Sequence, residues 1–122
     1  MSTKDEITIY HNPRCSKSRQ TLALLREHGV EPNIVEYLKE PPTQTRIRAL
    51  IKQLGIEPHA LVRAKESAYK ESGLSRESSD TAIVRAIADN PVLLERPVVV
   101  RGERAAIGRP PENVLPLLKK SR

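Results

Sequence analysis

Of the 122 residues in the chain, 38% are hydrophobic and 30% are charged, which fits one soluble globular domain and argues against intrinsic disorder. No apolar run approaches the ~20 residues of a membrane span, and the polar N-terminus shows no sign of a secretion signal. The single cysteine cannot form an internal disulfide, so we expect a cytoplasmic protein.

The net charge of +6 favours negatively charged partners. Lys and Arg are interleaved with acidic residues rather than grouped in a basic block, and the only aromatic residues are three tyrosines. The sequence therefore offers no platform for stacking nucleic-acid bases. We expect a small anionic substrate, no nucleic-acid or membrane partner, and a monomer.

The first predicted elements are a strand, a helix and a second strand. Residues 6–10 (EITIY) are rich in β-branched side chains, which favours a strand. A helix is predicted from near Ser16 to His28, where Gly29 provides the usual stop. Residues 33–37 form the next predicted strand. A strand, helix and strand within about thirty residues predict that the two strands are parallel.

The middle of the chain is predicted to be helical. Thr43 is the expected cap of a helix that ends at Gly55 and has apolar residues at helical spacing, namely Ile47, Leu50, Ile51 and Leu54. Further helices are predicted over residues 60–67, 68–72 and 80–88.

The pattern changes again near the C-terminal end. Just before this point, Ser79 or Asp80 is the expected cap of the helix predicted over residues 80–88. Residues 98–100 (VVV) predict a buried strand, residues 101–103 a turn, and residues 104–107 a returning hairpin strand. A final short helix is predicted from Val114, Leu117 and Leu118. The element order indicates a small mixed β-sheet covered by helices.

Cys15 occupies a chemically distinctive place in this arrangement, at or just before the start of the first helix. The backbone N–H groups there have no helical partner and carry partial positive charge, which favours a thiolate and can also hold an oxyanion. Basic neighbours could strengthen the effect, namely His11, Arg14, Lys17 and Arg19. A lone cysteine can also be a small buried apolar residue, but a polar loop before a helix favours a reactive role.

Ser18 stands where a dithiol oxidoreductase would have its second cysteine. An oxidised Cys15 therefore cannot be resolved by the chain's own thiols, and a redox cycle needs an outside thiol such as glutathione. We expect no metal site, because His11, His28 and His59 lack ligand spacing with Cys15.

The segments "IYHNPRCSKSR", "LLREHGVEPNIVEYL", "ERPVVV" and "IGRPPENVL" resemble the glutaredoxin-coupled arsenate reductase family of the ArsC type, and most closely its shorter, YfgD-like branch. The resemblance covers nearly the whole chain. It implies an α/β, thioredoxin-like fold in a single domain of residues 1–122, with a helical insertion at about 43–91. It also implies that Cys15 attacks arsenate, that glutathione forms a mixed species and arsenite leaves, and that glutaredoxin regenerates the thiol.

The same resemblance assigns roles to particular residues. Arg63, Arg96 and Arg109 match the family's three oxyanion-binding arginines. The residues expected to tune the thiolate are His11, Ser18 and Arg19. Taken alone, Arg63 could equally be a charge on a solvated helix face, and the other two arginines could simply precede prolines in turns.

The resemblance also makes Pro97 a candidate cis-proline, because a cis-proline commonly precedes the strand beside the catalytic loop of thioredoxin-like folds.

Two other functions are open. A monothiol, glutathione-dependent oxidoreductase would use Cys15 but has little need for three convergent arginines. An Spx-like transcriptional regulator, which binds RNA polymerase, shares the fold. Its redox switch needs two cysteines, however, and Ser18 removes one of them.

Overall fold

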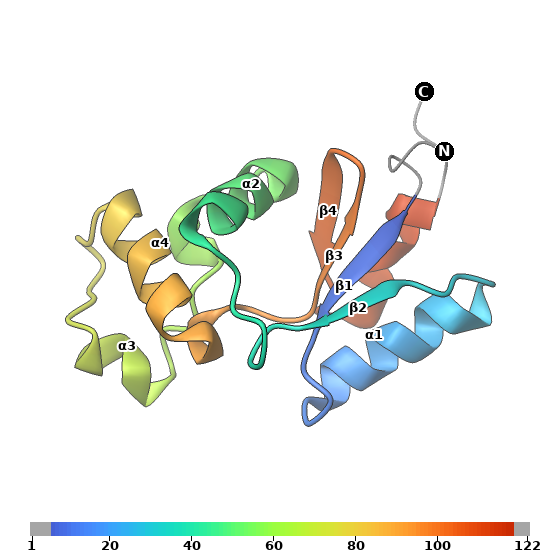
Figure 1. The fold of residues 1–122 in the computed structure, drawn as a ribbon, viewed down its shortest axis with the longest axis horizontal. Helices are drawn as coiled ribbons and strands as arrows, with labels where there is room; N and C mark the ends of the chain where they lie inside the picture. Colours follow the sequence, from blue (N-terminus) through green and yellow to red (C-terminus); the bar gives the residue numbers. More distant parts are fainter. Residues whose placement is uncertain (1–5, 119–122) are drawn as a thin grey trace. The chain divides into compact units, whose positions relative to one another are not determined.

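In the computed structural model, which describes residues 6–118, four strands form one mixed sheet in the order β2-β1-β3-β4 (Figure 1). The strands are β1 (Ile7–His11), β2 (Asn33–Glu36), β3 (Val98–Arg101) and β4 (Arg104–Ile107). β1 runs parallel to β2 and antiparallel to β3, and β3 and β4 form a hairpin. The predicted strands and the parallel pairing are confirmed.

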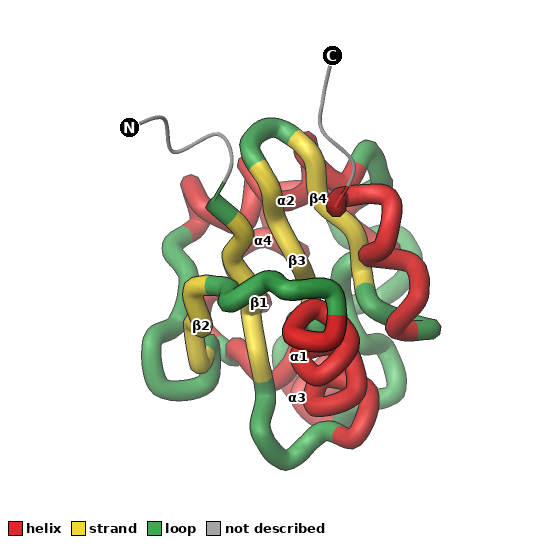
Figure 2. The backbone as a smooth tube through the Cα atoms, turned by 90° about the vertical axis from the view of Figure 1, so that its right-hand side faces the viewer, coloured by secondary structure: helices red, strands yellow, loops and turns green. Residues whose placement is uncertain are grey.

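Helix α1 (Ser16–Glu27) connects the two parallel strands. It ends before Gly29, whose φ of 80° is the left-handed conformation expected there. Together with the 3₁₀ helix η4 (Pro111–Leu118), α1 packs on one face of the sheet (Figure 2). The buried core between them consists of Ile7, Ile9, Leu25, Val99, Val114 and Leu117.

The final helix differs in type from an ordinary α-helix. η4 is a 3₁₀ helix with Pro116 in its interior. Proline lacks an N–H donor and clashes with the preceding turn of an α-helix, which accounts for the tighter helix. The apolar residues that predicted the element nevertheless lie where expected, because Val114 and Leu117 are buried.

Residues between β2 and β3 form α2 (Gln44–Leu54), α3 (Ser67–Glu71), α4 (Asp80–Asp89) and the 3₁₀ turns η2 (Pro58–Ala60) and η3 (Pro91–Leu93). Two predicted caps are confirmed. The Thr43 hydroxyl accepts the Arg46 N–H at 3.1 Å, and the Ser79 hydroxyl accepts the Ala82 N–H at 3.1 Å. α2 packs on α4 around a second group of buried side chains that includes Ile47, Leu50, Ile83 and Ile87.

The helix predicted over residues 60–67 is wrong. The structure has η2, then an antiparallel β-bridge between Val62 and Leu94, and α3 begins only at Ser67. The backbone around the bridge bonds across to η3, with the Arg63 N–H donating to the Leu93 carbonyl at 2.7 Å. Pairing with a distant segment has replaced the local helix that the composition favoured.

The chain forms two compact units. The sheet unit comprises the described residues up to Tyr37 and those from Arg96 onward, and the helical unit is Leu38–Glu95. The predicted insertion at about 43–91 falls inside the helical unit. Among residues 6–118, no helix is both long enough and apolar enough to cross a membrane.

Candidate active site

The loop between β1 and α1 is held by hydrogen bonds from its own residues. The Cys15 N–H donates to the Asn12 carbonyl at 3.0 Å, and the Arg14 N–H donates to Asn12 Oδ1 at 3.0 Å. The Arg19 side chain extends from α1 toward the loop, and its Nη1 donates to the Pro13 carbonyl at 2.8 Å. These bonds hold the loop in one conformation at the start of the helix.

Cys15 is the N-cap residue of α1, with an extended backbone (φ −92°, ψ 122°) and a half-buried side chain. Its side chain makes no capping hydrogen bond. Burial alone would raise the pKa of the thiol, but the backbone N–H groups of Ser18 and Lys17 and the charge and hydrogen bonding of Arg96 lower it. The net pKa lies below the ordinary thiol value, which increases the thiolate fraction near neutral pH.

His11 and Ser18 form a buried pair directly behind the loop. The His11 Nδ1 lies 2.6 Å from the Ser18 hydroxyl, which also accepts the Asn12 N–H at 3.0 Å. Ser18 is fully buried and His11 is 6% exposed. Two of the three residues predicted to tune the thiolate are thus in contact with each other, and they join the end of β1 to the first turn of α1.

Burial lowers the pKa of His11, and the nearby charge of Glu36 opposes this effect. The positive charges of Arg26 and Arg19 lower the pKa further. The imidazole is therefore neutral near pH 7. A neutral ring can accept the Ser18 hydroxyl proton or donate its own, depending on the tautomer.

Arg96 lies next to Cys15 although it is distant in sequence, because β3 pairs directly with β1. The Arg96–Pro97 peptide bond at the start of β3 is cis, in agreement with the prediction. The Arg109–Pro110 bond is also cis, which sequence reasoning missed even though the same Arg-Pro pair occurs there. Arg109 Nη1 donates to the Arg96 carbonyl at 3.4 Å, so these two predicted arginines are brought together.

Arg63 belongs to the helical unit, where its side chain is half-buried among carboxylates. Its Nη1 lies 2.5 Å from Glu66 Oε2, and its Nε lies 3.9 Å from Glu95 Oε1. These ion pairs give Arg63 a structural role within its own unit. Its assignment to oxyanion binding stays a prediction.

Two further arginines of the β3–β4 hairpin serve the fold. Arg101 Nη1 donates to the Leu117 carbonyl at 2.9 Å, and Arg104 Nη1 donates to the Pro116 carbonyl at 3.3 Å. They therefore bond to carbonyls at the end of η4, which a helix end leaves without internal donors. Sequence reasoning did not assign them to the site.

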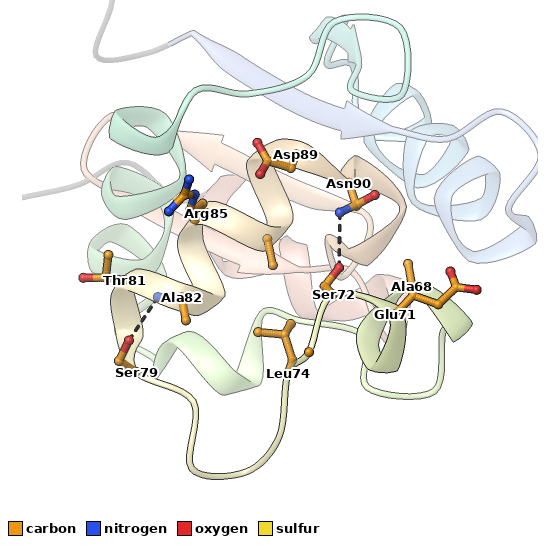
Figure 3. A pocket seen from close by; sticks show the side chains of 12 residues that line it. Ala68, Glu71, Ser72, Leu74, Ser79, Thr81, Ala82, Arg85, Asp89 and Asn90 are labelled. Atoms are coloured by element: carbon orange, nitrogen blue, oxygen red, sulfur yellow. Dashed lines mark hydrogen bonds between the residues drawn. The ribbon is translucent and has the colours of Figure 1, made fainter.

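Two of the hollows in the described part of the chain lie near the elements discussed so far. One, of about 640 Å³, lies beside the Cys15 loop and is lined by the loop and α1, including His11, Pro13 and Arg19. The other, of about 660 Å³, lies within the helical unit between α3 and α4 (Figure 3). In that pocket Asn90 Nδ2 donates to the Ser72 hydroxyl at 3.2 Å.

A mixed sheet with a cysteine at the start of its first helix, a cis-proline before the neighbouring strand and no second cysteine defines a thioredoxin-like protein with a single thiol. The comparisons with known proteins agree. The model of the ArsC family matches residues 10–117. The chain therefore belongs to the ArsC family.

Individual relatives match the chain in sequence, and a solved structure matches it in fold as well. The uncharacterized protein YfgD of Escherichia coli is 51% identical over 93% of this chain and 97% of its own length. An arsenate reductase of Neisseria meningitidis is 47% identical over 89% of this chain and 95% of its own. The solved structure of an arsenate reductase from Vibrio cholerae superposes with a TM-score of 0.88, at 46% identity over 92% of this chain and 97% of that one.

Proposed function

We propose that the protein is an arsenate reductase in which the Cys15 thiolate attacks the arsenic atom of arsenate, displaces one oxygen as water, and forms a covalent thiol–arsenate adduct. The observation that carries this proposal is the Arg96 guanidinium beside a thiol at the N-terminus of α1. Relatives of nearly the same length that bear the name arsenate reductase support the choice of substrate.

The site has the groups that a tetrahedral oxyanion requires. Guanidinium groups bind such anions through paired, charge-assisted hydrogen bonds. Arg96 lies beside Cys15, and Arg109 bonds to the Arg96 carbonyl. The first N–H groups of α1 add further donors near the thiol. These groups would stabilise the negative charge that arsenic oxygens carry during attack by sulfur.

Electron counting supports an outside reductant. Conversion of arsenate, As(V), to arsenite, As(III), takes up two electrons, and two thiols supply them when they become one disulfide. The chain has one cysteine, so at least one thiol must come from another molecule. We propose glutathione as that co-substrate and glutaredoxin as the partner that restores the free thiol.

The test is arsenate-dependent oxidation of NADPH in a mixture with glutathione, glutaredoxin and glutathione reductase. The wild type should show a rate that depends on arsenate and is absent in Cys15→Ser. Arg96→Gln should reduce kcat/KM for arsenate at least tenfold, because it removes a cation from the site. Arg46→Gln, which changes an exposed residue of α2, is the matched control and should behave as wild type.

Two other outcomes of this assay would contradict the assignment as an arsenate reductase. An absent arsenate-dependent rate, with glutaredoxin and glutathione reductase shown to be active, would overturn the proposal. Turnover of a glutathione mixed disulfide under those conditions, still dependent on Cys15, would identify a monothiol oxidoreductase instead.

A further inference from the structure

Gly108 differs from every other glycine in the chain. The other four have positive φ angles between 61° and 80°, so their backbone conformation explains the lack of a side chain. Gly108 has no such conformation. A β-carbon added to it would lie 2.5 Å from Thr21 Oγ1, 3.0 Å from Thr21 Cγ2 and 2.9 Å from Pro97 Cγ. Gly108 therefore lacks a side chain because Thr21 and Pro97 occupy the space that a β-carbon would need.

Those two neighbours belong to the two segments that carry the site, namely α1 and the Arg96–Pro97 segment. Thr21 is a fully buried residue of α1, and its hydroxyl donates to the Lys17 carbonyl in the first turn at 2.8 Å. Pro97 follows Arg96 through the cis peptide bond, and its carbonyl accepts the Gly108 N–H at 2.9 Å. The Gly108 carbonyl also lies 3.4 Å from the Thr21 hydroxyl.

We infer that Gly108 is a positioning residue for the active site: its missing side chain allows α1 and the Arg96–Pro97 segment to approach closely enough for Arg96 to reach Cys15. A methyl group at this point has contacts under 3.0 Å on both sides. Because interiors are close-packed, one or both segments must move apart to accept it. The inference depends on Cys15 being the reactive group but not on the identity of the substrate.

The experiment measures iodoacetamide alkylation of Cys15 against pH, which needs no arsenate. Gly108→Ala should move the midpoint upward by roughly 0.5 to 1 pH unit, part of the 1–3 units that an adjacent opposite charge produces. Adding Thr21→Ala removes two of the three close contacts. Because the Pro97 contact remains, the midpoint of the double variant should lie between those of Gly108→Ala and Thr21→Ala.

Two controls separate positioning from a general loss of stability. Gly55→Ala adds a methyl group to open space at a φ of 66°, so it should lower the melting temperature and leave the midpoint unchanged. In an Arg96→Gln background, Gly108→Ala should produce no further shift, because the group that it positions is absent.

A folded Gly108→Ala protein with the wild-type midpoint would overturn the inference, and so would a raised midpoint that Thr21→Ala does not lower. If Gly108→Ala does not fold, the decisive comparison is Thr21→Ala against the double variant, in which only the Pro97 contact remains. A higher midpoint in the double variant supports the inference, and equal midpoints contradict it. Failure of the arsenate assay alone leaves this test unaffected.

Discussion

At the scale of single residues, Arg96 has the largest expected influence on Cys15 among side chains, because its charge and its hydrogen bonding both lower the pKa of the thiol. Arg96→Gln removes both effects. The alkylation midpoint of Cys15 should then rise by roughly one pH unit or more. Iodoacetamide rates measured across pH give the midpoint, with Arg46→Gln as a charge-matched control that should leave it in place.

An unchanged midpoint in Arg96→Gln would mean that the helix N-terminus alone activates the thiol. The wild-type midpoint should in either case lie below that of an unfolded peptide containing the same loop sequence. A wild-type midpoint equal to that of the peptide would contradict thiol activation altogether.

The buried His11 makes stability depend on pH. Its folded pKa is lower than its unfolded value of about 6.5, so the folded state binds fewer protons. The stabilising contribution is complete above about pH 6.5 and is lost as the pH falls through that value toward the folded pKa. Urea unfolding at about pH 7.5 and about pH 5 should show a smaller pH-dependent loss for His11→Gln than for the wild type.

Cys15 is also ionisable and its pKa is lowered, so the comparison should be repeated in a Cys15→Ser background. The difference between histidine and glutamine at position 11 should persist there. Equal pH dependence in the two proteins would show that His11 does not carry a shifted pKa.

At the scale of elements, helix α2 depends on its cap. The Thr43 hydroxyl accepts the Arg46 N–H, which satisfies one of the free donors at the helix start. Thr43→Ala should lower the free energy of unfolding by about 1 kcal/mol. Thr45→Ala is the control, because Thr45 is exposed within the same helix and its replacement should change stability little. Urea denaturation of both variants measures the difference.

Sequence reasoning succeeded where local signals decide the structure. The caps Thr43 and Ser79, the stop at Gly55 and the β-branched residues of the strands all act within a few residues, and the elements that they predict appear close to their predicted bounds. It failed over residues 60–67, where backbone pairing between Val62 and Leu94 decides the conformation. Local sequence patterns do not predict a bridge between residues so far apart in the chain.

The same division applies to the site. Cys15, His11 and Ser18 lie in one short segment, so their proximity could be inferred from the predicted strand and helix. Local arginines were expected to activate the thiol, whereas the cation that lowers its pKa is Arg96. The contact of Gly108 with Thr21 depends on packing between the helix and the hairpin, which spacing along the chain does not reveal.

At the scale of the whole molecule, the net charge of +6 should favour anions that approach the thiol. Anionic iodoacetate should therefore react with Cys15 faster, relative to neutral iodoacetamide, than it does with a free small thiol. Raising the salt concentration from about 20 mM to about 500 mM should reduce this advantage several-fold, because the ions screen the protein's charge. A ratio that does not change with salt would exclude electrostatic attraction.

The pairing of β1 with β3 also has a consequence for the newborn polypeptide. During synthesis on a ribosome, Cys15 leaves the exit tunnel long before Arg96, since the entire helical unit is translated between them. Until β3 has been made and has joined the sheet, the nascent thiol lacks the guanidinium that lowers its pKa, so we expect it to be less ionised and less reactive toward electrophiles. We therefore expect the full reactivity of the Cys15 thiol to develop only late in synthesis, when the sheet is assembled.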